Sequence, residues 1–242
     1  MTNKLLILLA VVFGLVSCDE GDILPKENFT SKKGFSVRLS GNVSGYDDWQ
    51  NSDGYSLVLA GFGDPTGSMD YAVISKNIQA PDADGNIDIV MSGIPEGDVK
   101  TLEICVVNRL RVKLASFFVR ELTATETDTC EISAGDVDVS MRRMVQNEVF
   151  SPTCASCHGA SGKGARGLFL TDNDNFNPVS KPSGAVSGSL VVEPGNHLNS
   201  VLYRALIDNA GGALHQPHAD MLEAKRRDDL LKIVELWIDN VD

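Results

Sequence analysis

The chain has 242 residues, of which 43% are hydrophobic, and a formal net charge of -12 at pH 7. This length and composition suffice for one large hydrophobic core or two modest ones. The acidic balance argues against nucleic-acid binding, which needs clustered Lys and Arg side chains, but it leaves attraction to a basic protein partner open.

The N-terminus indicates export. Lys4 precedes an apolar run over residues 5–16, which is too short to span a bilayer because a spanning helix needs about 20 residues. The run ends in Leu15-Val16-Ser17-Cys18, which resembles the bacterial lipobox, where the cysteine is acylated after cleavage. We expect a signal peptide over residues 1–17, a lipid anchor on Cys18 and a polar tether over residues 18–33. An ordinary signal peptide with a nearby cysteine is the alternative.

Residues 34–139 show patterns typical of β-strands. Phe35, Val37 and Leu39 alternate with polar residues. Similar apolar runs follow, separated by Gly, Pro, Asn and Asp turn signals, at residues 55–62, 87–91, 102–107 and 112–119. About seven strands in this length predict an antiparallel, immunoglobulin-like sandwich. No catalytic constellation and no aromatic-rich platform stands out in it, so we expect a spacer or a binding module.

Residues 140–242 have helical patterns instead. Apolar residues at helical spacing run from Met141 to Phe150, and Pro152 is expected to end that helix before the cysteines. Two more apolar helical faces begin at Leu198 and Leu230. Residues 159–197 are rich in turn-forming types, a long loop that needs an organising group. The expected fold class is therefore a β-sandwich domain followed by an all-α domain.

The strongest chemical signal is Cys154-Ala155-Ser156-Cys157-His158. Two thiols at this spacing can reach the two vinyl groups on one porphyrin edge, while the adjacent histidine places its imidazole beneath the iron. A zinc site is the main competitor, with His215 and His218 as its second ligand pair. A redox dithiol is less favoured, because no βαβ pattern surrounds the motif. We predict one covalently bound haem c.

The segment from about Val139 to the C-terminus resembles a class I cytochrome c domain of the planctomycete type. The resemblance rests on the haem motif and on Gly159, Gly167-Leu168-Phe169-Leu170, Glu193-Pro194-Gly195, Ser200, Leu202, Met221 and Trp237-Ile238.

This resemblance implies an all-α domain in which Phe150 and Trp237 mark a helix crossing, with His158 as proximal iron ligand and Met221 as distal ligand. Two residues depart from the pattern. Gln146 stands about where the wider class has glycine, and Leu222 stands where the family commonly has proline.

We therefore expect an electron carrier that is exported and lipid-anchored, in the periplasm or at the outer-membrane surface, with an unidentified redox protein as partner. A filled sixth coordination site leaves no place for peroxide or oxygen, so no catalytic residue is assigned. His197, His215 and His218 are the other candidates for the sixth ligand. The alternative functions are a haem enzyme with an open sixth site and a surface binding module with an accessory haem.

Two further cysteines, Cys105 and Cys130, have no role in these assignments. Disulfides persist in exported proteins, so we expect these two residues to form one. Two inert buried thiols are the alternative.

Overall fold

The computed structural model describes residues 34–50, 52, 54–64, 70–123, 129–159, 164–171, 174–214 and 216–241. Residues from Lys33 to Asp242 form one compact unit. The predicted signal peptide, the Cys18 anchor, the tether and His215 lie outside the described residues. None of the helices in the described ranges is both long enough and apolar enough to cross a membrane.

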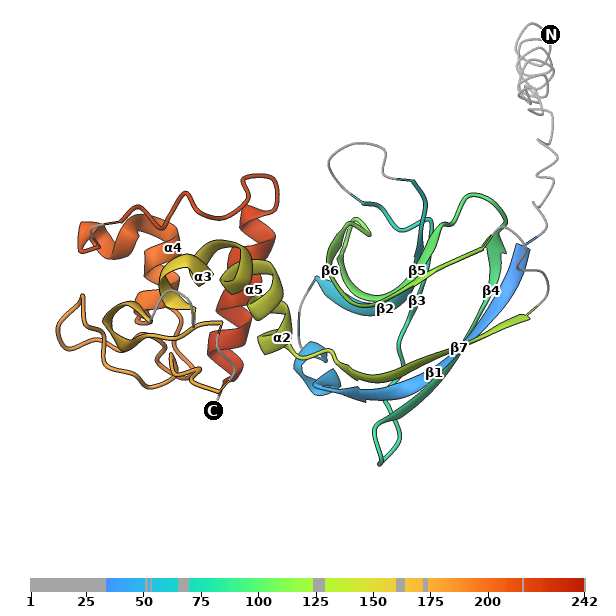
Figure 1. Ribbon diagram of the computed structural model, residues 1–242, viewed down its shortest axis with the longest axis horizontal. Coiled ribbons are helices and arrows are strands. Elements are labelled where there is room, and N and C mark those ends of the chain that lie inside the picture. The colour runs from blue at the N-terminus through green and yellow to red at the C-terminus, as the bar shows by residue number, and fades with distance from the viewer. Residues whose placement is uncertain are drawn as a thin grey trace, which may run out of the picture. The chain divides into compact units, whose positions relative to one another are not determined.

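Seven strands in the described ranges form two sheets (Figure 1). The first sheet has the order β4-β1-β7 and consists of β1 (Gly34–Ser44), β4 (Asn86–Pro95) and β7 (Thr129–Asp138). The second has the order β3-β2-β5-β6 and consists of β2 (Tyr55–Phe62), β3 (Ile74–Asn77), β5 (Thr101–Asn108) and β6 (Lys113–Glu121). β1 is antiparallel to β4 but parallel to β7. The purely antiparallel arrangement that we predicted is therefore wrong.

Strand β1 shows how the alternation of residue types produces the core. Val37 and Leu39 are fully buried, while Arg38 between them points outward and binds Asp88 on β4 with two hydrogen bonds of 2.9 and 2.6 Å. The two central strands of the second sheet, β2 and β5, are buried on both faces. On β5, Ile104 joins the main core, whereas its neighbour Cys105 joins a smaller cluster. Side chains alternate across a strand, so this sheet separates the two clusters.

The location of Cys105 corrects one of our predictions. Cys105 is a free thiol, and burial raises its pKa. Cys130 lies on β7 in the other sheet and packs against the main core. Cys105 belongs to the smaller cluster instead. The prediction of a Cys105–Cys130 disulfide is therefore wrong, because the two side chains belong to different sheets and to different apolar clusters.

The C-terminal part differs from the all-α domain that we predicted. Its regular α-helices are short, namely α2 (Met141–Val145), α3 (Ala155–His158), α4 (Val201–Gly212) and α5 (Arg227–Asn240). The backbone of α4 is non-helical from Asp208 to Gly211. Described residues between 164 and 200 form turns, isolated β-bridges and one 3-10 turn, η3 (Ala165–Gly167).

The predicted fold class is therefore wrong: the described part of the chain is mostly β-sheet, and its described C-terminal residues form no large all-α domain. The physical reason lies in the distribution of residue types. Helical spacing of apolar residues is confined to short runs, and Gly, Asn, Asp and Pro residues between these runs favour turns over helix.

The chain also continues to wind beyond Pro152, which we expected to end the first helix. Between α2 and α3 it forms a π-helix, η2 (Gln146–Cys154), with Pro152 inside. Proline removes one donor from the ladder of backbone hydrogen bonds, and a wider turn with i→i+5 bonds is a local adjustment that keeps the chain helical. The cysteine motif consequently stands at the end of a continuous helical segment.

Three aromatic rings join this segment to α5. Phe150 and Trp237 meet edge to face with ring centroids 5.8 Å apart, which confirms the predicted contact between these two residues. Phe176 lies 6.2 Å from Phe150 and 6.3 Å from Trp237. Gln146, which departs from the pattern of the resemblance, is buried with 7% of its surface exposed. Its side chain is part of the packing, and its Oε1 has no hydrogen-bond partner among the described residues.

Hydrogen bonds connect the helical segments with the sheets. The Trp49 indole N–H donates to the Val139 carbonyl at 2.5 Å. The Tyr55 hydroxyl and the Asn108 side-chain amide donate to the two carboxylate oxygens of Asp229, on α5, at 3.0 and 3.1 Å. These contacts lie within the compact unit that begins at Lys33. Nothing in them tests the domain boundary predicted between residues 139 and 140, which stays a prediction.

A buried carboxylate lies on the second sheet. Only 3% of Glu103 is exposed, and its carboxylate accepts hydrogen bonds from the hydroxyls of Thr101 and Ser116. The Lys113 ammonium lies 3.1 Å from both carboxylate oxygens and 3.1 Å from Asp70. Burying a charge costs free energy unless it is paired, so Lys113 is the group that makes a buried Glu103 tolerable.

We predict that Lys113→Met lowers the free energy of unfolding by about 3 kcal/mol, because it leaves the Glu103 charge buried without its cation. The matched variant Asp70→Asn removes the more exposed partner of the same lysine and should cost less than about 1 kcal/mol. Urea unfolding followed by circular dichroism measures both. Equal losses for the two variants would contradict this account.

Candidate functional site

The cysteine motif occupies the last turns of the helical segment that starts with α2. Cys154 ends η2, and the remaining residues of the motif form α3. Because Cys154 and Cys157 are three residues apart on a helical turn, their thiols lie on the same side of it. Cys157 is exposed, whereas Cys154 is half-buried and packs against the main core.

The His158 side chain is oriented by a backbone carbonyl. Its Nδ1 lies 3.2 Å from the carbonyl oxygen of Leu168. A carbonyl can only accept a hydrogen bond, so Nδ1 carries the proton and Nε2 keeps its lone pair. The backbone amide of Leu170 donates to the His158 carbonyl at 2.8 Å. Residues 168–170 thus hold His158 by its ring and by its backbone, and they leave Nε2 available to a metal.

Two glycines allow this segment to approach the motif. A Cβ on Gly159 would lie 2.6 Å from the Ala155 carbonyl oxygen and 2.6 Å from the Thr171 hydroxyl oxygen. Gly164 has a φ of +55°, and the Phe169 ring packs against it so closely that a Cβ would lie 2.4 Å from the ring. Any side chain at either position would push residues 168–171 away from His158.

The surroundings favour uncharged forms of the motif's side chains. Burial lowers the pKa of His158; the hydrogen bond to Leu168 opposes this effect, and the charge of His218 lowers the pKa further. Burial raises the pKa of Cys154, while the Thr153 hydroxyl lowers it and Cys157 raises it. The imidazole is therefore mainly neutral near pH 7, which is the form that binds a metal.

Met221 and His218 share one turn between α4 and α5, since the amide of Met221 donates to the His218 carbonyl at 3.1 Å. The Met221 side chain is 40% exposed, whereas Leu222 is 4% exposed and belongs to the main core. Leu222, which departs from the pattern of the resemblance, thus anchors the turn by burial.

A backbone carbonyl also orients the imidazole of His218. Its Nδ1 lies 2.7 Å from the Gln216 carbonyl, so its Nε2 lone pair is available by the same reasoning as for His158. The side-chain oxygen of Asn209 accepts from the amides of His218 and Ala219, at 2.5 and 2.9 Å. Sequence reasoning missed Asn209. The run Asp208-Asn209-Ala210-Gly211-Gly212 is the turn signal that could have indicated it.

His197, the weaker alternative ligand, is engaged elsewhere. Its Nδ1 lies 2.9 and 2.7 Å from the two carboxylate oxygens of Asp239, and its ring packs edge to face on Tyr203. Ligand-type atoms of His197, Glu235 and Asp239 lie within 4.8 Å of one another, a cluster that sequence reasoning missed. Lys232 forms an ion pair with Glu235. Because His197 binds Asp239 and Glu235 pairs with Lys232, we assign the cluster a structural role in joining the turn before α4 to α5.

The chain was also compared with known proteins. No protein-family model, curated protein or solved structure matches it.

Proposed function

We propose that this protein is a mono-haem c-type cytochrome that carries electrons outside the cytoplasm. The observation that supports the proposal best is the hydrogen bond from His158 Nδ1 to Leu168, which leaves Nε2 available beside two thiols on one side of a helical turn. Cys154 and Cys157 would hold haem c through two thioethers, and His158 would bind its iron. Bound haem c supplies an iron that takes up and releases one electron.

The protein's own residues would set the properties of this iron. The Leu168 carbonyl fixes the ring orientation and makes the His158 imidazole a better donor. Burial keeps the imidazole uncharged, so no proton has to leave before the nitrogen binds. The rings of Phe150 and Trp237 hold the helical segment that carries the motif against α5.

We propose Met221 as the sixth ligand, as the resemblance to class I cytochromes c implies. Its side chain is 40% exposed, and Leu222 and Asn209 anchor the turn that carries it. A soft thioether suits an iron that must be stable in both oxidation states. Six-coordinate iron favours electron transfer over catalysis, so we propose a carrier and no catalytic residue.

Zinc is less well supported as the occupant. Among the described residues, the thiols of Cys154 and Cys157 do not converge with a third ligand-type atom, whereas a structural zinc ion is usually held by four ligands in a tetrahedron. We further propose that acylated Cys18 anchors the protein to a membrane, in the periplasm or at the outer-membrane surface, and that its partner is a redox protein. Cys18 lies outside the described residues.

Covalent attachment is the first test. Expression with a cytochrome c maturation system should give one haem per chain by pyridine haemochrome, and the haem should stay with the chain on a denaturing gel. The double variant Cys154→Ala/Cys157→Ala should lose it entirely, because no other thioether is possible there. The matched variant Cys105→Ala removes a buried thiol outside the motif and should keep full haem. Haem that acid-acetone extracts from the unmodified protein, or stoichiometric zinc in its place, would contradict the proposal.

The sixth ligand is tested by a matched pair of variants. Met221→Ala should abolish the near-infrared band of ferric iron with methionine ligation and lower the redox potential by on the order of 0.1 V, since axial ligands tune haem potentials over a wide range. His218→Ala should leave the band unchanged and shift the potential much less. If the unmodified protein shows a bis-histidine spectrum that is lost in His218→Ala and kept in Met221→Ala, His218 is the ligand and the Met221 assignment is wrong.

A further inference from the structure

The peptide group between Leu168 and Phe169 carries the carbonyl that orients His158. This carbonyl lies 3.2 Å from His158 Nδ1, and the N–H of the same peptide group donates to the side-chain oxygen of Asn177 at 3.0 Å. Because a peptide group is planar and rigid, a hydrogen bond to its N–H also fixes the direction of its C=O. Asn177 therefore acts on the group that holds the His158 imidazole.

Asn177 binds the segment around this peptide with three hydrogen bonds. Besides the bond to Phe169, its side-chain N–H donates to the Gly167 carbonyl at 3.0 Å, and its backbone N–H donates to the Phe169 carbonyl at 3.3 Å. The orientation of the side-chain amide follows from its partners, since the Phe169 N–H can only donate and the Gly167 carbonyl can only accept. None of the three bonds uses the Leu168 carbonyl, which binds His158.

Asn177 is itself anchored by its two neighbours in the chain. Phe176 packs on the rings of Phe150 and Trp237, with centroids 6.2 and 6.3 Å away. Pro178 is buried, and its carbonyl accepts a backbone hydrogen bond of 3.1 Å. A proline also disfavours a helical backbone at the residue before it, which restricts the conformation of Asn177. The half-buried Asn177 side chain therefore starts from a fixed place.

We propose that Asn177 is a positioning residue of the candidate site, whose side-chain amide sets the Leu168 peptide group so that His158 keeps its proton on Nδ1. Hydrogen bonds in a row polarise one another, so the bond from Phe169 to Asn177 also makes the Leu168 carbonyl a stronger acceptor. A stronger acceptor on Nδ1 makes the imidazole a better donor to a bound metal. The effect on haem iron rests on the proposed function, whereas the effect on the proton of His158 does not.

NMR of the full chain, labelled with ¹⁵N and expressed without a maturation system, tests the positioning role without haem. At about pH 8, where an imidazole is uncharged, His158 of the unmodified chain should carry its proton on Nδ1. Asn177→Ala should lower the ratio of the Nδ1–H to the Nε2–H form about fivefold, the effect of losing about one hydrogen bond.

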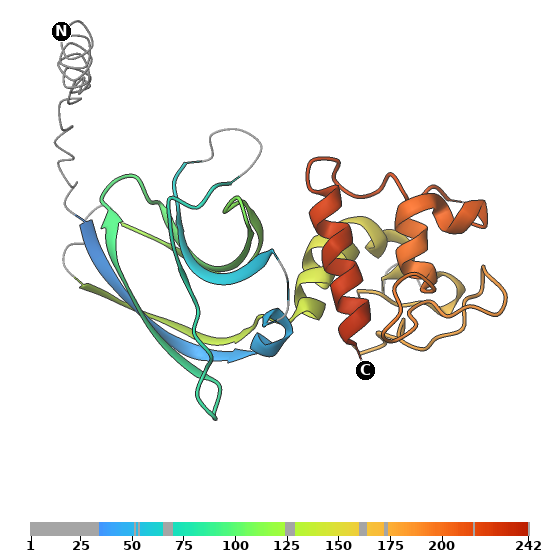
Figure 2. The ribbon, with the colours of Figure 1, turned by 180° about the vertical axis from the view of Figure 1, so that it is seen from behind.

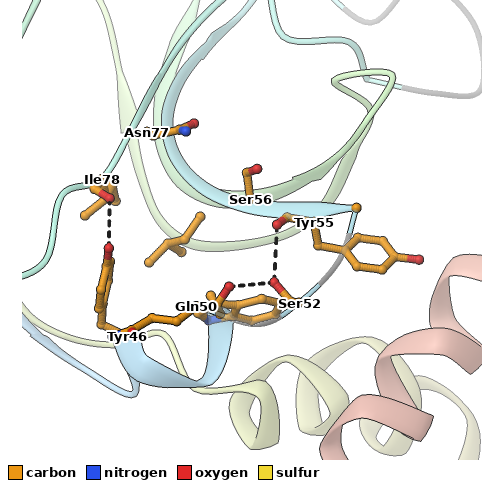
Figure 3. A pocket seen from close by; sticks show the side chains of 10 residues that line it. Tyr46, Gln50, Ser52, Tyr55, Ser56, Asn77 and Ile78 are labelled. Carbon is orange, nitrogen blue, oxygen red and sulfur yellow. Dashed lines mark hydrogen bonds between the residues drawn. The ribbon is translucent and has the colours of Figure 1, made fainter.

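Two control variants lose side-chain hydrogen bonds elsewhere. Asn196, in the turn before α4, also donates and accepts through its side-chain amide, at 3.3 and 3.2 Å. The buried Ser52 hydroxyl lies 2.8 and 3.2 Å from two backbone carbonyls and links the turn η1 (Tyr46–Trp49) to β2 (Figure 3). None of these bonds involves residues 167–170. Asn196→Ala and Ser52→Ala should therefore leave the proton of His158 on Nδ1.

The haem-containing protein gives a second readout. Asn177→Ala should raise its redox potential, because a weaker acceptor on His158 Nδ1 makes the imidazole a poorer donor to ferric iron. At a fixed solution potential, the ratio of ferrous to ferric protein should rise about threefold. Asn196→Ala and Ser52→Ala should keep the ratio of the unmodified protein.

Two results would overturn the inference. The first is a ratio of the two His158 forms in Asn177→Ala that equals the ratio in the controls. The second needs no variant and therefore holds even if Asn177→Ala does not fold: it is a Phe169 amide that exchanges in the unmodified chain as fast as in an unfolded one. A chain without covalent haem in which Asn177→Ala still shifts the proton of His158 would contradict the proposed function and support the positioning role.

Discussion

Two hydrogen bonds from one short segment hold His158, and the candidate site depends on them. The Leu168 carbonyl accepts from the imidazole, and the Leu170 amide donates to the His158 backbone at 2.8 Å. The approach is possible because Gly159 and Gly164 leave room that any Cβ would fill. Residues 168–170, which form no regular helix or strand, thus orient the imidazole of His158 and its Nε2. The helical segment supplies the thiols and lies beside α5, the red helix of Figure 2. The ring contact between Phe150 and Trp237 fixes its place there.

Several strands could be predicted from the sequence because alternation of apolar and polar residues is a local property. The run at residues 55–62 is strand β2, and the runs at 87–91 and 102–107 lie inside β4 and β5. How the strands pair is not local. The parallel pairing of β1 with β7 joins segments that are almost a hundred residues apart in the sequence. The alternation of residue types alone also does not predict on which face of its sheet Cys105 lies. The disulfide and the antiparallel sandwich were wrong for this reason.

In the candidate site, too, local features could be predicted from the sequence and non-local contacts could not. Cys154, Cys157 and His158 are adjacent in the chain, so their pattern predicts them without any knowledge of the fold. The groups that orient these residues and the turn of His218 are backbone groups or single polar side chains, such as the Leu168 carbonyl and the Asn209 side-chain amide. The type of such a residue does not indicate in the sequence that it will make this contact. Apolar spacing likewise overstated the helices, since turn-forming residues interrupt them and the structure is mostly β-sheet.

The central claim is that the Leu168 carbonyl holds His158 with a proton on Nδ1 and leaves Nε2 for the haem iron. NMR of the reduced, haem-containing protein with ¹⁵N-labelled histidine tests it most directly. The account predicts one imidazole whose Nδ1 proton exchanges slowly with water and lies close to Leu168, and whose Nε2 carries no proton. A proton on Nε2 of His158, or an Nδ1 proton that exchanges as fast as that of an exposed histidine, would contradict it.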